Sequence, residues 1–468
     1  MFDFKKYNNN IAVVCADGQQ KSYAELEEEC IEFHHHILTG SLVFCLCENT
    51  WASLVGYVAC LSHRHPILLL DGKKDLELVK RLVAIYQPKY LWMPSSRVTE
   101  FGEGDSVYSM GGYELLEMPY TQFPIHPNLA LLLTTSGSTG SPKLVRLTAD
   151  NLRSNAEAIA EYLGIDEHER AITSLPMYYS FGMSVINSHL IQGATLLLTD
   201  SAVTQKEFWT MMREEHATSI AGVPYTYEML RRLRFFRMEL PHLKTMIQAG
   251  GKLNAAIAKE YIDFAQSSGR RFFVMYGQTE AAPRMSYLPF ERALEKYASI
   301  GVPIPGGKLS IRDVDDNPID EADVDGELIY EGPNVCYGYA ECKEDFAKGD
   351  ENNGTLHTGD VARKDKDGFF YITGRMKRFV KVWGNRCNLD ATEQLVKSIT
   401  TNCACVGVDD LITVFVTEQG LEDRIKKYLV EKTGLNSRAF KVRIIDEIPT
   451  KSSGKLDYQA LQALINGQ

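Results

Sequence analysis

The chain has 468 residues, of which 44% are hydrophobic and 24% are charged, and its formal net charge is −11. That length is enough for at least two domains with their own cores, and the composition is ordinary for a globular protein. The acidic balance argues against a general nucleic-acid binder, which would carry a basic face.

The cysteine pattern and the N-terminal residues point to the cytoplasm. Ten cysteines are scattered along the chain and no two have the Cys-x-x-Cys spacing, which favours reduced core thiols over zinc ligands or disulfides. The first residues lack the apolar core of a signal peptide, and no apolar run approaches the roughly 18 residues that cross a bilayer. We therefore expect a cytoplasmic protein without a membrane span.

Short apolar runs alternate with helical patterns along the first half of the chain. Residues 41–47 predict a strand, 51–61 an apolar helix, 67–70 a second strand and 74–86 a mixed-charge helix. The alternation recurs between residues 164 and 276. It is typical of parallel sheets with covering helices and predicts an α/β fold. From about residue 300 to 371, Gly- and Asp-rich turns between short runs predict a small antiparallel region.

The segment 134–143, Thr-Thr-Ser-Gly-Ser-Thr-Gly-Ser-Pro-Lys, follows a predicted strand. A loop of this kind offers backbone N–H groups, hydroxyls and one cation, which suit the oxygens of a polyphosphate. It fits neither a Walker loop nor a dinucleotide fingerprint. Taken alone, the segment could equally be a flexible turn.

Four further segments follow in order. Residues 276–280, Tyr-Gly-Gln-Thr-Glu, end a predicted strand with a carboxylate that can hold Mg²⁺ against phosphate oxygens. Asp360 can accept two ribose hydroxyls, and Arg375 offers a planar donor fork. A basic run occupies 376–386, and residues 449–457 contain Lys455. Taken singly, these segments could be turns or solvated faces.

These five segments resemble, in content and order, the motifs of the adenylate-forming superfamily. Its members include acyl-CoA synthetases, aryl-CoA ligases, luciferases and the adenylation domains of nonribosomal peptide synthetases. The motifs span about two thirds of the chain. The resemblance implies a large N-terminal domain, 1–375, of mixed and parallel sheets with covering helices and a small antiparallel barrel-like region. It also implies a small mobile α+β domain, 376–468, that rotates about a hinge at Lys377.

The resemblance also assigns roles to single residues. Tyr276 would stack on adenine, Glu280 would hold the metal, and Lys455, Lys143, Thr279 and Glu280 would be catalytic. Val274 departs from the Asn or Gln that the family often carries near adenine, so backbone groups at 248–251 are expected to select the base. The implied nucleotide-binding set is Thr134, Thr135, Ser136, Gly137, Ser138, Thr139, Gly140, Lys143, Gly250, Gly251, Tyr276, Gly277, Thr279, Asp360, Arg375 and Lys455.

The implied reaction uses ATP and Mg²⁺. A carboxylic acid would attack the α-phosphate to give an acyl-adenylate and pyrophosphate, and Lys455 would bridge the two anions as they approach. A pantetheine thiol, from CoA or an acyl carrier protein, would then take the acyl group. Arginines at 231, 232, 234 and 237 could meet the phosphates of CoA or an acidic carrier, or could form a solvated helix face.

The acyl pocket is expected around residues 175–182, with an apolar lining and phenolic hydroxyls. Its members would be Tyr178, Tyr179, Phe181, Val223, Tyr225 and Ala281, although several of the tyrosines could be core. No Asp is present there to pair an ammonium group, which would cost about 1–3 kcal/mol if left unpaired. We therefore expect a small or medium acyl or aryl acid. The alternatives are a stand-alone adenylation domain for an amino acid and a degenerate nucleotide-binding member without turnover.

Overall fold

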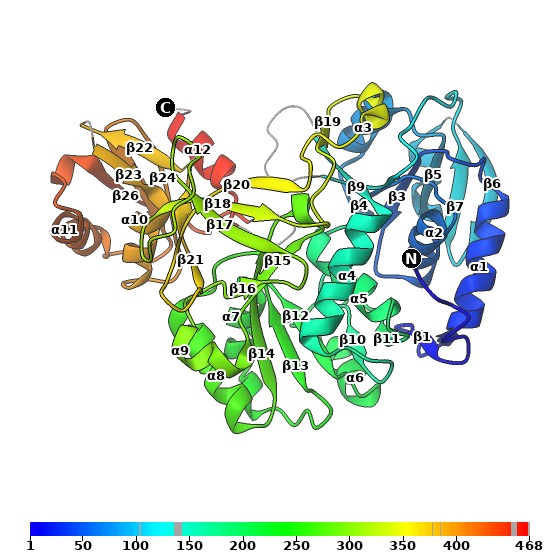
Figure 1. Cartoon of the computed structure of the whole chain (residues 1–468), viewed down its shortest axis with the longest axis horizontal. Coiled ribbons are helices and arrows are strands. Elements are labelled where there is room, and N and C mark those ends of the chain that lie inside the picture. The colour runs from blue at the N-terminus through cyan, green and yellow to red at the C-terminus, as the bar shows by residue number, and fades with distance from the viewer. Residues whose placement is uncertain (103, 135–142, 377, 384, 451–455, 467–468) are drawn as a thin grey trace. The chain divides into compact units, whose positions relative to one another are not determined.

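The computed structural model describes all residues except 103, 135–142, 377, 384, 451–455 and 467–468 (Figure 1). The described chain divides into two compact units. The first contains residues 1–297, 301–308 and 330–356, and the second contains residues 298–300, 309–329 and 357–468. The domain boundary expected after Arg375 stays a prediction.

An eight-stranded sheet in the first unit has parallel strands at its centre and antiparallel strands at its edges. All five side chains of β3 are buried, as expected for a parallel strand that is covered on both faces. The strand order is β19 (Tyr339–Ala340), β9 (Leu144–Thr148), β8 (Leu129–Thr134), β4 (Ile67–Asp71), β3 (Val43–Cys47), β5 (Tyr90–Pro94), β7 (Tyr113–Glu117) and β6 (Asp105–Met110).

A nine-stranded sheet forms the other half of the first unit. Strands β11, β10, β12, β13 and β14 are parallel, and β15 returns antiparallel to β14. The order is β16 (Val302–Pro303), β15 (Arg284–Tyr287), β14 (Arg271–Gly277), β13 (Thr245–Gln248), β12 (Ser219–Gly222), β10 (Arg170–Ile172), β11 (Thr195–Leu197), β1 (Ile11–Val14) and β2 (Gln20–Ser22).

Helices cover these sheets, and local sequence explains where they begin. Ser22 and Thr148 cap α1 and α4 with capping boxes, and Gly164 ends α4 in a left-handed conformation. One core cluster contains side chains of both sheets and of α1, α2, α4 and α5. The helices are α1 (Tyr23–His35), α2 (Trp51–Ser62), α3 (Leu76–Tyr86), α4 (Ala149–Leu163), α5 (Ser180–Leu190), α6 (Lys206–Glu214), α7 (Pro224–Arg232), α8 (Ala255–Ser267) and α9 (Ala293–Lys296).

The second unit contains most of a four-stranded sheet and a compact α+β region. The sheet order is β17 (Lys308–Arg312), β18 (Gly326–Glu331), β20 (Thr355–Lys364) and β21 (Phe370–Arg375). Among the described strands this sheet has two free edges, so the barrel-like region is an open sheet. The α+β region contains β22 (Phe379–Val382), β23 (Asn385–Asn388), β24 (Cys403–Val408), β25 (Leu411–Val416), β26 (Phe440–Ile444), α10 (Leu389–Lys397), α11 (Glu422–Thr433) and α12 (Tyr458–Asn466).

The mixed α/β fold that the sequence predicts is therefore confirmed. All ten cysteines are free thiols, and seven of them are buried. Among the described residues, no helix combines the length and the apolar character that crossing a bilayer requires.

Candidate active site

Several predicted site residues follow the carboxyl ends of neighbouring parallel strands. The register aligns Gly222 at the end of β12 with Gln248 at the end of β13, and Gln248 with Val274 of β14. The next loops carry Val223 and Gly250, so these two residues lie at one edge of the nine-stranded sheet. Ligands of open α/β sheets bind at this edge.

Gly250 brings three predicted residues together. Its φ of +81° favours glycine. A Cβ atom built on Gly250 would lie 2.4 Å from the Tyr179 hydroxyl oxygen and 3.0 Å from Val223 Cγ1. The buried Gln248 amide holds this loop by donating to the Gly251 carbonyl over 2.9 Å. The loop predicted to select adenine and the predicted acyl pocket therefore touch at Gly250.

A tight turn at the end of β14 carries the Tyr-Gly-Gln-Thr-Glu segment. A Cβ atom on Gly277 would lie 1.8 Å from the Pro283 carbonyl oxygen, so only glycine fits. The Gln278 amide donates to the same carbonyl over 2.9 Å. The turn then forms the short 3-10 helix η3 (Thr279–Ala281), which carries Glu280.

Glu280 and Lys143 meet around Tyr339, a residue that no sequence motif singles out. The Tyr339 hydroxyl donates to Glu280 Oε1 over 2.8 Å, and Lys143 Nζ lies 5.8 Å from the centre of the Tyr339 ring. Pairing of Tyr339 with Val145 of β9 places the tyrosine beside the end of the phosphate-loop segment. Burial and then the Glu280 carboxylate raise the pKa of Tyr339, so its hydroxyl stays protonated and donates.

Lys143 is free to exchange its partner. Its ammonium pairs with Glu341 Oε1 at 2.6 Å, and both side chains are about half exposed. An exposed pair of this kind contributes about 0–1 kcal/mol, so a polyphosphate can take the lysine at little cost. Lys143 therefore has the chemistry of a phosphate ligand.

Glu280 is the one predicted metal ligand. Within the described residues, no group of three or more His, Cys, Asp and Glu side chains is arranged to hold a metal ion. Mg²⁺ in nucleotide sites uses one or two carboxylates together with phosphate oxygens and water. A single Glu280 carboxylate near Lys143, the predicted phosphate ligand, fits that donor set.

The N-terminus of α5 contacts η3, the short helix that carries Glu280. Ser180, the first residue of α5, has its hydroxyl 3.2 Å from the hydroxyl of Thr279. The sequence gives no signal for this serine beyond its place between two predicted pocket residues, Tyr179 and Phe181. The contact connects the predicted catalytic turn to the predicted acyl pocket.

Four of the six predicted pocket residues share one cluster. Phe181 and Val223 are buried in the core that joins the two sheets, and Tyr178 and Tyr179 pack against it. The Tyr179 ring lies edge-on to Phe181 at 6.2 Å. Burial raises the pKa of Tyr179 to about 12, so its hydroxyl can donate at neutral pH. Ala281 is buried within η3.

Tyr178 packs against this cluster and also contacts the other sheet, whereas Tyr225 is exposed. The Tyr178 hydroxyl donates to Asp71 Oδ2 over 3.1 Å and so contacts the end of β4 in the eight-stranded sheet. Tyr225 lies in the first turn of α7 and is 53% exposed. The structure does not bring Tyr225 into the cluster around Phe181.

Arg284 lies next to Phe181, and the sequence analysis above does not include it. Its guanidinium carbon is 4.1 Å from the centre of the Phe181 ring, and its side chain is fully buried. The only signal in the sequence is a lone basic residue in the strand that follows the turn at 277–283.

Asp360 and Arg375 pair with each other in the second unit. They are register partners on β20 and β21, and Arg375 Nε lies 2.9 Å from Asp360 Oδ1. Asp360 is 3% exposed at its side chain, whereas Arg375 is 60% exposed. The pair offers a fixed carboxylate with an accessible cation beside it.

Part of the predicted site lies outside the described residues. This is the case for Thr135, Ser136, Gly137, Ser138, Thr139, Gly140, the hinge residue Lys377 and the catalytic Lys455. Thr134 is described, and it pairs with Leu144 in the antiparallel register of β8 and β9.

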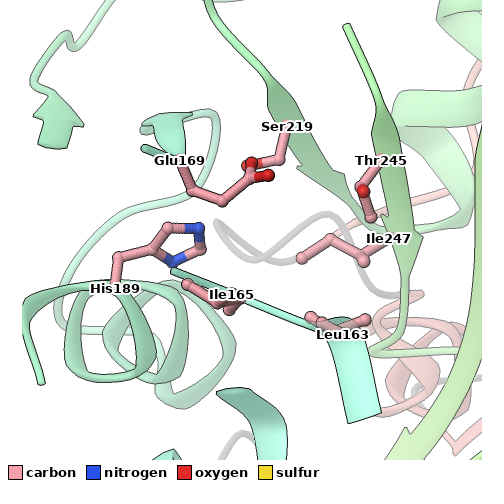
Figure 2. Close-up of a pocket in the computed structure, with 7 residues that line it drawn as sticks. All are labelled: Leu163, Ile165, Glu169, His189, Ser219, Thr245 and Ile247. Atoms are coloured by element: carbon pink, nitrogen blue, oxygen red, sulfur yellow. The ribbon is translucent and has the colours of Figure 1, made fainter. Parts of the chain in front are cut away.

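A small cavity lies at the opposite edge of the nine-stranded sheet, where β12 and β13 begin. Figure 2 shows Glu169 and His189 facing it, together with Ile165 and Ile247. Its volume of about 10 Å³ holds at most about one water molecule. His189 Nδ1 contacts the Val185 carbonyl at 2.8 Å, and burial lowers the pKa of His189. The cavity is part of the packing and cannot admit a substrate.

Comparison with known proteins identifies the family of this chain. The profile of the AMP-binding enzyme family matches residues 3–340, more than half of the chain. Feruloyl-CoA synthase from Amycolatopsis is 29% identical over 350 residues, 70% of this chain and 68% of its own. The 2-succinylbenzoate–CoA ligase from Bacillus pumilus is 26% identical and covers 97% of this chain and 95% of its own.

Solved structures show the same fold. The o-succinylbenzoate CoA synthetase from Bacillus subtilis, in complex with its acyl-adenylate intermediate, superimposes with a TM-score of 0.80 at 21% identity, covering 98% of this chain and 97% of its own. ATP-bound MatB from Rhodopseudomonas palustris gives 0.81 at 21% identity, with 98% of both chains covered.

The chain is a mixed α/β protein with the same fold as these two solved structures. The chain belongs to the family of AMP-binding enzymes.

Proposed function

We propose that this protein is an AMP-forming acid–thiol ligase. It activates a carboxylic acid with ATP to an acyl-adenylate, releases pyrophosphate and transfers the acyl group to CoA. The observation that carries the proposal is the cluster of Lys143, Tyr339 and Glu280 beside the Thr279–Ser180 contact. Relatives named as feruloyl-CoA, 2-succinylbenzoate–CoA and long-chain-fatty-acid–CoA ligases support the thiol step.

Each group has a defined task in this reaction. Lys143 exchanges Glu341 for phosphate oxygens, and Glu280, oriented by Tyr339, would hold Mg²⁺, which neutralises phosphate charge. Asp360 accepts the ribose hydroxyls, and Arg375 adds a cation. Tyr276 stacks on adenine, while the 248–251 loop supplies backbone groups for the base in place of a side chain at Val274.

Lys455 completes the proposal. It would bridge the acid and the α-phosphate as charge develops, on a C-terminal domain that turns about Lys377 after adenylation and admits the thiol. Since no protein nucleophile is needed, the buried cysteines have no catalytic role.

The test is acid-dependent ATP–pyrophosphate exchange without thiol, across fatty, aryl, hydroxy, dicarboxylic and amino acids. Exchange with a non-amino acid, followed by thioester formation with CoA, is the expected result. Lys455→Ala should lower exchange by roughly 10²–10³-fold while ATP still binds. If Lys455→Ala exchanged ATP and pyrophosphate as fast as the wild type, Lys455 would not be the catalytic lysine. If only amino acids supported exchange, the protein would be an amino-acid-activating enzyme instead.

A further inference from the structure

Two arginines of the first unit are fully buried, and their surroundings differ. Arg146 and Arg284 are each 1% exposed. The Arg146 guanidinium donates to backbone carbonyls of Tyr337, Tyr339, Lys348 and Gly349, and its Nη2 lies 2.5 Å from the Glu351 carboxylate. Arg146 is therefore a satisfied structural arginine with its own counter-ion.

Arg284 has weak partners and no counter-ion among the described residues. Its Nη1 lies 2.6 Å from the thioether sulfur of Met275, and its Nη2 lies 3.2 Å from the Ser184 hydroxyl. Its Nε has no hydrogen-bond partner. A guanidinium has five donors, and a thioether is a poor acceptor. Burial lowers the pKa of Arg284. The phenol of Tyr162, which hydrogen-bonds to the guanidinium, and the phenol of Tyr179 favour its charge, but neither is a counter-ion.

An arrangement of this kind is costly in the absence of a ligand. A buried charge without a counter-ion destabilises a protein by several kcal/mol, and the Tyr162 phenol and the Phe181 ring offset only part of that. The remaining donor capacity suits a planar carboxylate, which accepts two parallel hydrogen bonds from a guanidinium.

The position of Arg284 relates it to the acyl pocket. Ser184, which contacts Arg284, lies one turn of α5 beyond Ser180, which contacts Thr279. Four residues of an α-helix advance by about 6 Å. Phe181 and Tyr179, both predicted to line the pocket, are neighbours of the guanidinium together with Tyr162. The guanidinium is therefore about one helical turn from the turn that carries the proposed catalytic residues.

We propose that Arg284 binds a second carboxylate of the acid substrate, so that the enzyme activates a short dicarboxylic acid at one end. This inference rests on the proposed function. The distal carboxylate supplies the counter-ion that the folded protein lacks. A monocarboxylic acid of equal length would leave the guanidinium without a counter-ion.

The test compares acids in pairs of equal carbon number. Succinate, glutarate and adipate are measured against butyrate, valerate and hexanoate in ATP–pyrophosphate exchange with the full-length enzyme. We expect one dicarboxylate to exceed its partner by roughly 10–100-fold in kcat/KM, as for loss of a charge-assisted hydrogen bond. In Arg284→Met that preference should fall to within a few-fold, and Arg284→Lys should retain part of it.

A stability measurement separates this role from a structural one. Without ligand, Arg284→Met should unfold at the same or a higher temperature than the wild type, because an uncompensated charge is replaced by an apolar chain. The matched control Arg146→Met should unfold at a clearly lower temperature, because it leaves Glu351 and several carbonyls without a donor. Glutarate or succinate should raise the unfolding temperature of the wild type but not of Arg284→Met.

The outcomes are distinct. Equal use of the paired acids by the wild type, or a fall in the unfolding temperature of Arg284→Met as large as that of Arg146→Met, would overturn the inference. No exchange with any acid would contradict the proposed function instead. In that case Arg284-dependent stabilisation by a dicarboxylate would still support the anion site, and its absence would overturn it.

Discussion

The hydroxyl of Tyr339 donates to the carboxylate of Glu280 over 2.8 Å, although 59 positions separate the two residues in the chain. The contact forms because β19 pairs with β9 at the end of the phosphate-loop segment. Through β19, the contact connects Glu280, the residue proposed to hold Mg²⁺, to β9, the strand that follows Lys143.

Tyr339→Phe should weaken use of the metal. Removing the donor frees the Glu280 carboxylate to rotate, and a hydrogen bond to a charged group contributes about 1.5–3 kcal/mol. We expect roughly a tenfold rise in the Mg²⁺ concentration that half-saturates ATP–pyrophosphate exchange. Tyr337→Phe is the control, since the Tyr337 hydroxyl contacts only exposed Asn128 at 3.4 Å. Equal effects of both changes would show that the Tyr339 contact has no special role.

Gly250→Ala should impair the site through contact with Tyr179. The new Cβ atom would lie 2.4 Å from the Tyr179 hydroxyl oxygen, so we expect at least a tenfold loss of exchange activity, by analogy with displacement of positioning groups. Gly269→Ala is matched for backbone strain, because Gly269 has φ +68° and no atom within 4 Å of the built Cβ.

The two glycine variants separate strain from contact. Both should lose about 1 kcal/mol of unfolding free energy, but only Gly250→Ala should lose activity. Adding Tyr179→Phe to Gly250→Ala should restore part of it, because the hydroxyl that the Cβ atom meets is removed. Failure of the second change to restore any activity would indicate that the backbone at Gly250, not Tyr179, is displaced.

Asp360→Asn should reduce discrimination for the ribose. The wild type is expected to prefer ATP over 2′,3′-dideoxy-ATP by roughly 10–100-fold in exchange, because two hydroxyls donate to the carboxylate. The variant should lose most of that preference. Since Arg375 is 60% exposed, its ion pair with Asp360 contributes about 0–1 kcal/mol, and the unfolding free energy should change little. If Asp360→Asn still preferred ATP over 2′,3′-dideoxy-ATP, the ribose hydroxyls would not bind to Asp360.

Acid should destabilise the first unit through His65. This buried imidazole contacts His34 at 2.9 Å, and burial, with His34 and His63 nearby, lowers its pKa to about 4. The unfolded chain takes up a proton near pH 6.5 and the folded chain only near pH 4, so stability is complete above pH 6.5 and falls as the pH drops through this window. From pH 7.5 to 5 the loss attributable to His65 is about 2 kcal/mol.

Chemical denaturation at the two pH values measures this loss. His65→Gln keeps a hydrogen-bonding group for His34. Its unfolding free energy should fall by about 2 kcal/mol less than that of the wild type between pH 7.5 and 5. His168→Gln, at an exposed position, should behave like the wild type. If the unfolding free energy of His65→Gln fell as much as that of the wild type, groups other than His65 would cause the acid sensitivity.

The elements of the first unit follow from local patterns of the sequence. The runs 41–47, 51–61 and 67–70 became β3 (Val43–Cys47), α2 (Trp51–Ser62) and β4 (Ile67–Asp71), because continuous burial demands continuous apolar sequence. The motif order likewise predicted the family that the profile match shows.

The remaining features depend on contacts between distant segments. Tyr339 reaches Glu280 only through strand pairing, and Ser180 reaches Thr279 across 99 positions. Arg284 would be expected at a surface from its charge alone, and its burial follows from its place on β15 against α5. Tyr225 is exposed while Tyr227 is buried on the same helix, a distinction of helix face that the tyrosine-rich segment does not reveal.

The pairing of Thr134 with Leu144 has a consequence for how this sequence can change. Both residues belong to strands buried in the eight-stranded sheet. The packing of these strands fixes the backbone at Thr134 and Leu144 without any ligand. Substitutions confined to residues 135–143 should therefore change nucleotide use, measured by ATP–pyrophosphate exchange, more than the unfolding temperature.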